Sequence, residues 1–575
     1  MHLKGLHLVV ALATAVALAV GIPAAADVGS GTGPPTSIGT GGAAASVEKL
    51  ATQAAIDILR RGGNAIDAAV GSAAVLGVTE PFSCGVGGGG FMVIRTAGGR
   101  VTTIDGRETA PAAMHPTSFW VNGAPLPFND ARYSGLSVGV PGTVETWADA
   151  LERFGTMSLA EVFAPAIHVA RHGYVIDQVW FDQVNANRDW FDDIPASAAL
   201  FLDADGTPRD VGTVFTNPAL AKTYERIAHL GAKGFYRGAV ADALVETVQH
   251  PVVSPTANHV WRPGVIKMRD LHTYVAPERA PTHVNYRGLD VYSMGPPSSG
   301  GSTVGEALNI LEGYNLSSMT REAALHYYLE ASRYSFADRN AYLADPAYFD
   351  VPLSGLLSEE YAAQRRELIT ETAAPGAVPP GDPYPYEGAE TTTHLTTSDK
   401  SGNVVSYTFT IESTGGAGLV VPGYGFLLNN ELTDFNFDST THPNRVEGGK
   451  RPRSSMAPTI VTKAGKPFLA VGSPGGATII TTVLQILLDR VDLGLTLPQA
   501  IADPRASQRN ALNTGAEPAF LSTPERVALE ARGHHFINAG EIGAATGIEF
   551  LTGGGVLAAA EPVRRGGGSA MTELP

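Results

Sequence analysis

The sequence has little cysteine, little charge and more acid than base. Cys84 is the only cysteine among 575 residues, which excludes an intrachain disulfide and a metal site built from paired cysteines. Charged residues make up 17% of the chain, and its formal net charge is −16. Because a surface of that sign repels nucleic acid and anionic membrane, we expect neither as a partner of the mature protein.

Metal-binding and nucleotide-binding patterns are also scarce. The HExxH and P-loop patterns do not occur, and the adjacent His534 and His535 form a poor metal site because neighbouring side chains point apart. Residues 85–90 spell GxGxxG, but a helix is expected before them and a strand after them, the reverse of the dinucleotide-binding order. We therefore expect no metal and no cofactor, and a turn of closely packed backbones at 85–90.

The first 26 residues are predicted to be a signal peptide. Lys4 supplies the positive start, residues 8–20 form an apolar run, and Ala24 to Ala26 provide small residues for cleavage. We expect cleavage after Ala26 and a secreted or periplasmic product. A retained membrane anchor is the alternative, but the run is short for a membrane span.

The rest of the chain reads as mixed helices and strands with one linker. Residues 27–45 are typical of a mobile leader, and a buried helix capped by Asn64 is expected soon after them. Residues 371–390 are rich in proline, have no apolar periodicity and predict an exposed linker. Strand patterns resume directly after it, at 393–397 and 404–411.

Two neutral features could carry acyl-transfer chemistry. Thr391 to Thr393 begin a strand after the linker, and a threonine at a chain N-terminus can use its own α-amine as the base. Gly475 and Gly476 lie between a strand and a helix, where backbone N–H groups can bind an oxyanion. Each feature alone is also compatible with an ordinary strand start or turn.

Charged and hydroxyl side chains supply candidate binding groups. Arginine and hydroxyls together can hold a carboxylate, and carboxylates can hold an ammonium. Each of these residues alone is more typical of a surface charge. The candidates are Arg107, Ser454 and Ser455 for the carboxylate, and Glu431 and Asp434 for the ammonium.

From about residue 46 to 570, the sequence resembles the γ-glutamyltransferase family of N-terminal-nucleophile hydrolases. The resemblance implies an α+β fold, an αββα sandwich of two stacked sheets covered by helices. It also implies a precursor that cuts itself into a large subunit, residues 27–391, and a small catalytic subunit, residues 392–575, which remain one intertwined unit. The matching segments are GGNAIDAAV (62–70), GVGGGGFMV (85–93), GRETAP (106–111), GLSVGVPGTV (135–144), GPPSSGG (295–301), TTH (392–394), LLNNE (427–431), RPRSSMAPTI (451–460) and GSPGG (472–476).

The resemblance also implies roles for particular residues. Thr392 becomes the nucleophile and Thr410 orients it, while Gly475 and Gly476 form the oxyanion hole. The substrate α-carboxylate is held by Arg107, Ser454 and Ser455, and the α-amine by Glu431 and Asp434. The implied activity is hydrolysis or transfer of the γ-glutamyl group of glutathione-like substrates, with water or an amino acid as acceptor.

Two departures from the family keep alternatives open. Glu412 stands where the family commonly has asparagine, which places a third carboxylate near one ammonium and is expected to raise a pKa or displace a side chain. Residues 436–449 lack a tyrosine that closes the site in some members, so a more open pocket is expected. The alternatives are an acylase acting on glutaryl-type β-lactam side chains, an enzyme of poly-γ-glutamate, and an unprocessed binding protein.

Overall fold

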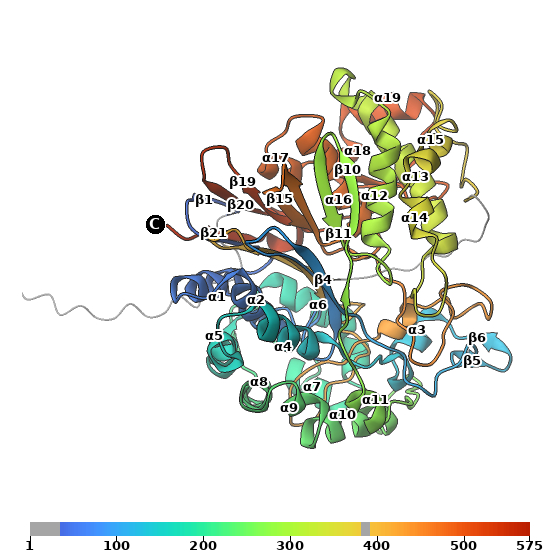
Figure 1. Ribbon diagram of the computed structural model, residues 1–575. Helices are drawn as coiled ribbons and strands as arrows, with labels where there is room; N and C mark the ends of the chain where they lie inside the picture. The colour runs from blue at the N-terminus through green and yellow to red at the C-terminus, as the bar shows by residue number, and fades with distance from the viewer. Residues whose placement is uncertain (1–34, 381–391, 575) are drawn as a thin grey trace, which may run out of the picture.

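Two stacked antiparallel sheets, each with seven strands, form the centre of the protein, and helices cover both outer faces (Figure 1). The computed structural model describes residues 35–380 and 392–574. Sheet A has the order β1 (Thr36–Gly39), β20 (Val556–Ala560), β19 (Thr546–Phe550), β15 (Lys466–Gly472), β14 (Thr459–Lys463), β11 (Leu289–Ser293) and β10 (Thr282–Tyr286). Sheet B has the order β21 (Ser569–Thr572), β2 (Ala43–Ser46), β12 (Thr393–Ser398), β13 (Val404–Thr410), β3 (Gly89–Arg95), β4 (Val101–Gly106) and β9 (Glu278–Arg279).

Different helices cover the two sheets. Helices α1 (Lys49–Arg60), α2 (Ala65–Thr79) and α4 (Thr143–Phe154) lie on the sheet B side, and α2 contacts both β12 and β13. On the other side, α12 (Gly300–Glu312) and α16 (Thr478–Val491) pack on sheet A, and α13 (Arg321–Tyr342) packs on them. The expected αββα sandwich is confirmed.

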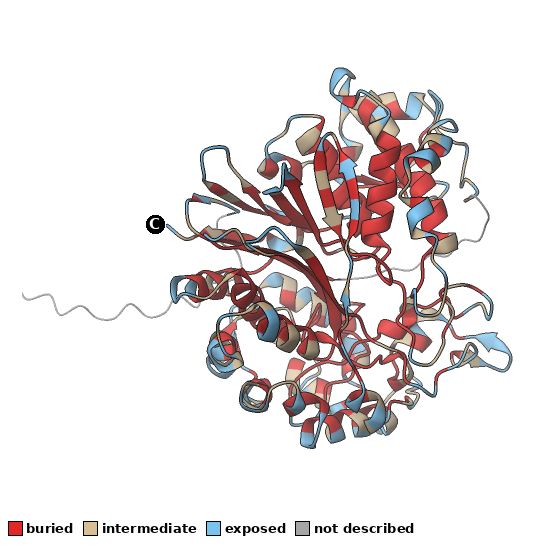
Figure 2. Cartoon of the chain, in the orientation of Figure 1, coloured by how far each residue is buried: buried red, intermediate tan, exposed pale blue. Residues whose placement is uncertain are grey.

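Helix α2 illustrates how the composition produces this layering. Its residues are mostly Ala, Val, Gly and Ile, and every one of them is buried. Asn64 caps it by accepting from the N–H groups of Ile66 and Asp67, as the sequence predicted. A helix without a polar face can only occupy an interior layer. In Figure 2 the central strands of the two sheets and the helix faces that pack on them are coloured as buried, while edge strands such as β10 also carry exposed residues.

Both sheets combine strands from the two sides of the linker. In sheet B, β2, β3, β4 and β9 precede the linker, whereas β12, β13 and β21 follow it. In sheet A, β10 and β11 precede the linker and lie beside β14, which follows it. Any two chains formed by a cut at the linker would therefore share both sheets.

The expectation of a mobile leader over residues 27–45 is wrong for its described part. Thr36–Gly39 form β1 at the edge of sheet A, and Ala43–Ser46 form β2 between β12 and β21. Ala43 and Ala45 of β2 are buried against β19 and β20 of sheet A, and Ala44 is buried on the opposite face, in the cluster that contains α1 and α2. Composition alone did not show this, because the strand is too short for a period-two pattern.

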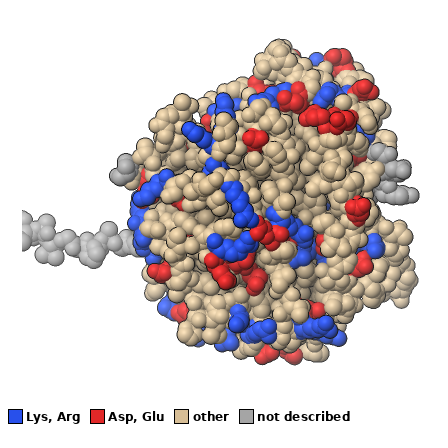
Figure 3. Space-filling model, viewed as in Figure 1, with Lys and Arg blue, Asp and Glu red and all other residues tan. Residues whose placement is uncertain are grey.

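The other expected features fall as follows. Residues 371–380 of the linker are irregular and alternate between exposed and half-buried, and Val378 donates its N–H to Asn510. The predicted signal peptide, residues 1–26, and linker residues 381–391 lie outside the described residues. Within residues 35–380 and 392–574, no helix combines the length and apolar character needed to cross a membrane. On the face that Figure 3 shows, acidic and basic side chains lie side by side.

The remaining described helices are α3 (Phe128–Arg132), α5 (Leu159–His172), α6 (Gln178–Phe191), α7 (Pro195–Phe201), α8 (Pro218–Leu230), α9 (Lys233–Tyr236), α10 (Ala239–Gln249), α11 (Met268–His272), α14 (Leu353–Leu356), α15 (Glu359–Arg366), α17 (Leu497–Ala502), α18 (Pro518–Leu521) and α19 (Pro524–Ala531). Three smaller sheets are formed by β5 (Trp120–Val121) with β6 (Ala124–Pro125), by β7 (Tyr174–Val175) with β8 (Val214–Phe215), and by β16 (Ala506–Ser507), β17 (Thr514–Ala516) and β18 (Phe536–Asn538). Single 3-10 turns are η1 (Gly135–Ser137), η2 (Leu316–Ser318), η3 (Glu431–Asp434) and η4 (Arg564–Gly566).

Candidate active site

Two threonines on adjacent strands of sheet B form one end of a small pocket. Strands β12 and β13 pair antiparallel with Thr393 opposite Phe409, and this register continued by one residue sets Thr392 opposite Thr410. Both threonines line the pocket and are nearly inaccessible, at 3% and 2% exposure. We call Thr392 and Thr410 the nucleophile end of the pocket, after the role that the resemblance implies for Thr392.

The glycine run at 85–90 shapes this end. A Cβ on Gly88 would lie 1.9 Å from the carbonyl oxygen of Thr410, so only glycine allows this approach. The hydroxyl of Thr410 also accepts the N–H of Glu412 at 2.8 Å, where the chain leaves the sheet. As predicted, helix α2 precedes the run, and β3 begins within it at Gly89, so the backbones pack closely in this turn.

Buried charges form the other end of the same pocket. Arg107 follows β4 and is 1% exposed, and its guanidinium pairs with Glu431 and Asp434 of η3. Two further donors of Arg107 reach backbone carbonyls, at 3.1 Å from Pro452 and 3.0 Å from Arg453. The guanidinium is therefore fixed in the pocket wall.

Glu108 and Glu412 add two more buried carboxylates beside these pairs. We call Arg107, Glu108, Glu412, Glu431 and Asp434 the charged end. Burial raises the pKa of Glu108 to about 8, and burial together with Asp434 raises the pKa of Glu412 to about 8. Burial also raises the pKa of Glu431, although Arg107 opposes the shift. Because an unpaired buried carboxylate is costly, folding favours the protonated form of Glu108 and Glu412.

Glu412 has an unusual backbone as well as a raised pKa. Its φ is +76°, a region that asparagine adopts more readily than glutamate. Its carboxylate accepts from the amide of Asn430 and the hydroxyl of Ser413, and it lines the pocket with Glu431 and Asp434. The predicted crowding of three carboxylates at one site is thus present, with the raised pKa that it implies.

The two neighbouring serines differ in their surroundings. Ser454 lines the pocket, and its hydroxyl accepts the N–H of Met456 at 3.2 Å. Ser455 is fully buried, is not among the residues lining the pocket, and its hydroxyl accepts from Arg339 at 2.6 Å. The structure therefore brings Ser454 to Arg107, while Ser455 lies against Arg339.

The loop containing Gly475 and Gly476 follows β15 of sheet A. The end of β15 packs against the start of β12 in sheet B. A Cβ on Gly472, at the end of β15, would lie 2.3 Å from the ring of His394. Gly475 and Gly476 have φ of +128° and +59°, and within the described residues their N–H groups donate no hydrogen bond. Free N–H groups in a glycine loop are what an oxyanion hole requires.

Several residues of this region were missed by sequence reasoning. Glu108 belongs to the charged end, and Arg132 and Asn430 face or contact Glu412 within it. Arg339 contacts Ser455, and Arg565 contacts Thr392. Glu108 stands next to Arg107, and Asn430 is part of LLNNE, so proximity in the motifs could have indicated both. Nothing local marks Arg132, Arg339 or Arg565. In the described part of the chain, no group of three or more His, Cys, Asp and Glu side chains forms a metal site.

The empty space between the two ends is small. Its non-atom volume is about 160 Å³, which leaves no room for a separate water molecule, and it is lined by Arg107, Thr392, Thr410, Glu412, Glu431, Asp434, Ser454 and Met456. A hydroxyl pair thus faces a cluster of opposite charges across a narrow gap. This arrangement suits attack on an amide whose far end carries both a carboxylate and an ammonium.

Comparison with known proteins gives matches along nearly the whole chain. Residues 51–571 match the family described as gamma-glutamyltranspeptidase. A glutathione hydrolase proenzyme from Bacillus subtilis (strain 168) is 39% identical over 489 residues, covering 81% of each protein. The acylase ACY 1 proenzyme from Pseudomonas sp. (strain SE83) is 35% identical over 538 residues, covering 91% of this chain and 92% of that protein.

Solved structures give the same two kinds of relative. A cephalosporin acylase from Bacillus halodurans matches with a TM-score of 0.84 at 29% identity, covering 94% of this chain and 98% of that chain. A gamma-glutamyltranspeptidase from Helicobacter pylori matches with a TM-score of 0.55 at 34% identity, covering 59% of this chain and 96% of that chain.

Proposed function

Because this chain belongs to the gamma-glutamyltranspeptidase family, we propose that it is a γ-glutamyl hydrolase and transferase whose nucleophile is Thr392, exposed by self-cleavage. The observation that carries the proposal is the meeting of Thr392 and Thr410 with the Arg107, Glu431 and Asp434 cluster in one pocket. Glutathione-like peptides are the proposed substrates, and water or an amino acid is the acceptor.

Self-cleavage is the first step of the proposal. The hydroxyl of Thr392 attacks the carbonyl of Thr391, the acyl group moves from nitrogen to oxygen, and water hydrolyses the ester. The products are residues 27–391 and 392–575 after loss of the signal peptide. The coverage of the Helicobacter pylori structure supports this, since 96% of that chain corresponds to only 59% of this one, a share close to that of residues 27–391.

Catalysis then uses the newly formed terminus. The α-amine of Thr392 takes the proton from the hydroxyl of the same residue. The Oγ of Thr392 then attacks the γ-carbonyl of the substrate. The N–H groups of Gly475 and Gly476 stabilise the oxyanion, a contribution of about 3–4 kcal/mol per donor in other enzymes. The amine returns the proton to the leaving group, and water or an acceptor amine releases the acyl group.

Substrate recognition follows from an exchange of ion pairs. In the structure Arg107 pairs with Glu431 and Asp434. A bound α-carboxylate would pair with Arg107 beside Ser454, while the α-ammonium would pair with the acids that Arg107 releases. A zwitterion thereby leaves no buried charge alone, whereas a group with only a carboxylate leaves the acids without a cation.

A related acylase is the second candidate, and two observations favour it. In sequence, acylase ACY 1 matches 91% of this chain, whereas the glutathione hydrolase from Bacillus subtilis matches 81%. Glu412, with a pKa raised to about 8, is largely protonated at neutral pH, and a neutral acid tolerates a substrate that lacks the ammonium. A poly-γ-glutamate enzyme and an unprocessed binding protein have less support.

The deciding experiment compares two substrates after establishing the cut. Purified protein is run on a denaturing gel, and the smaller band is sequenced from its N-terminus. We expect that sequence to begin at Thr392, and turnover of a γ-glutamyl anilide to exceed that of a glutaryl anilide. An active enzyme that remains a single chain would refute the mechanism, and faster turnover of the glutaryl compound would favour the acylase.

Secreted protein beginning at Met1 would refute the proposal that residues 1–26 are removed on export.

A further inference from the structure

An arginine from the C-terminal segment touches the backbone of the proposed nucleophile. Arg565 lies in η4, between β20 and β21, and has a φ of +54°, which is uncommon for a residue other than glycine. One arm of its guanidinium donates to the carbonyl oxygen of Thr392 at 2.7 Å, and the other donates to the hydroxyl of Ser83 at 2.8 Å. No step of the proposed function uses this side chain.

Ser83 extends the contact to the second strand of the nucleophile end. Its carbonyl accepts the N–H of Ile411, the residue after Thr410, at 3.2 Å. One guanidinium therefore connects the start of β12 to the end of β13 through a single serine. A planar group with several fixed donors is suited to hold two such points at once.

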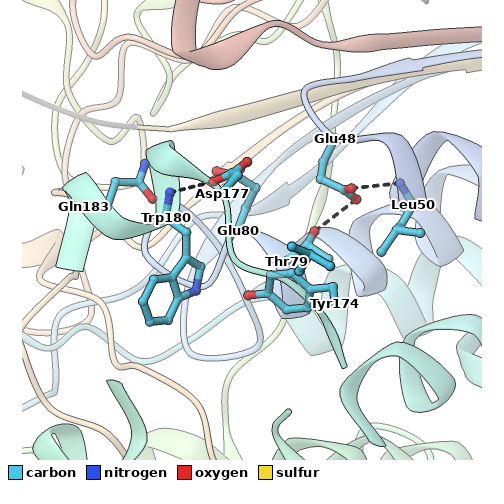
Figure 4. A pocket seen from close by; sticks show the side chains of 9 residues that line it. Glu48, Leu50, Thr79, Glu80, Tyr174, Asp177, Trp180 and Gln183 are labelled. Carbon is cyan, nitrogen blue, oxygen red and sulfur yellow. Dashed lines mark hydrogen bonds between the residues drawn. The ribbon is translucent and has the colours of Figure 1, made fainter. Parts of the chain in front are cut away.

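Glu80 supplies the counter-charge for this guanidinium. Its carboxylate lies 3.8 Å from Arg565, and burial raises the pKa of Glu80 while Arg565 opposes that shift. Glu80 belongs to a second pocket, together with Glu48 and Asp177 (Figure 4). Both neighbouring carboxylates have other hydrogen-bond partners. Glu48 caps α1, and Asp177 caps α6 by accepting the N–H of Trp180. Glu80 is thus the acid of this pocket that engages Arg565.

We propose that Arg565, balanced by Glu80, is a positioning residue that holds the carbonyl of Thr392 and keeps the α-amine of the cut chain neutral. This inference rests on the proposed function, since the amine exists only after the cut. A free α-amine has a pKa of about 8, so at neutral pH much of it would be protonated and unable to act as a base. A guanidinium beside the same residue disfavours the ammonium form and lowers that pKa.

The charges around Thr392 differ between its two sides. Arg565 stands on the backbone side, and the pocket side contains an excess of acids. The groups that face this region are Arg107, Glu412, Glu431 and Asp434 across the pocket, Arg565 and Glu80 behind the backbone, Glu48 and Asp177 behind Glu80, and Glu541, which accepts the N–H of Arg565. Since the acids favour the ammonium, Arg565 is the positive charge placed to oppose them.

The test is the pH dependence of acylation in the processed protein, measured by stopped flow with a γ-glutamyl anilide. In Arg565→Gln we expect the acidic limb of the acylation rate to move to higher pH by about one unit. Glu80→Gln removes the counter-charge and should move the limb in the opposite direction. Arg565→Lys, which keeps the charge, should stay closer to the wild type than Arg565→Gln. Arg526→Gln, in an exposed pair with Glu530, is the matched control.

The outcomes separate this inference from the proposed function. A wild-type chain that is not cut would overturn both. If the wild type is cut and active, but Arg565→Gln and Glu80→Gln lower the rate without moving the limb, Arg565 is only structural and this inference alone is wrong. If the Arg565→Gln chain does not cut itself, Glu80→Gln becomes the deciding variant. The acidic limb of its acylation rate must then move to lower pH. Thermal unfolding of each variant shows whether the fold is intact.

Discussion

At the nucleophile end of the pocket, Thr392 and Thr410 come from neighbouring strands, whereas Arg107, Glu412 and Glu431 of the charged end come from segments that leave the sheets. The first end is neutral and is placed by strand register and by the close approach of Gly88. The second is crowded with carboxylates whose raised pKa values reflect burial. Backbone geometry thus determines where the two threonines lie, and burial and neighbouring charges determine the protonation of the carboxylates.

This difference predicts how each end responds to substitution. Changes at the nucleophile end should abolish chemistry with little effect on stability or on substrate choice. Changes at the charged end should alter binding, specificity and pH dependence in graded amounts. The four predictions below test that division, from the largest expected effect to the smallest.

Thr392→Ala should produce an uncut and inactive chain, because both steps require the hydroxyl. Thr392→Ser should cut, more slowly. Thr393→Val is the matched control, since in the described residues the Thr393 hydroxyl has no hydrogen-bond partner and valine has the same shape. A denaturing gel and anilide turnover measure all three. Cutting by Thr392→Ala would contradict the assignment of the nucleophile.

Arg107→Ala should lower kcat/KM for a γ-glutamyl anilide far more than it changes the rate of self-cleavage. Leaving a buried substrate carboxylate without its partner costs on the order of 2–5 kcal/mol. Arg100→Ala, at an arginine whose side chain is 62% exposed, is the control. If Arg107→Ala left kcat/KM unchanged, the carboxylate would be bound elsewhere.

Glu412→Asn should raise the preference for γ-glutamyl over glutaryl substrates, because asparagine removes one of three crowded acids. Asparagine also suits a φ of +76°, so the variant should be no less stable than the wild type. Glu412→Gln removes the ionisable carboxyl but keeps a side chain that disfavours a φ of +76°, so it separates the electrostatic effect from the backbone effect. An unchanged ratio of kcat/KM values would mean that Glu412 does not contact the substrate.

Glu108→Gln should flatten the pH dependence of stability. A carboxyl whose pKa rises from 4.5 to about 8 on folding contributes stability that is complete below pH 4.5 and is lost as the pH rises toward 8. Between those values the variant should lose less stability than the wild type. Urea unfolding at several pH values measures the difference, and parallel curves would show that Glu108 is ionised in the folded protein.

Much of the fold was predictable because its signals are local. Asn64 and the apolar residues after it predicted α2, and the alternation around residues 404–411 predicted β13. Strand β2 was missed, because three alanines in a row carry no period and become a strand only between β12 and β21. At the site, motif residues such as Thr392 and Arg107 were found, but Arg132 and Arg565 were not.

The sequence by itself determined the class of fold, the family and the candidate nucleophile, because helix caps, strand alternation and motifs each depend on residues that are close in the sequence. Only the tertiary structure decided that Arg107 pairs with Glu431 and Asp434, and that Arg565 touches Thr392. Arg107 is 324 and 327 residues from its two acids, and Arg565 is 173 residues from Thr392. Whether a carboxyl holds its proton likewise depends on burial and on the charges that folding brings to it, and neither is a property of the local sequence.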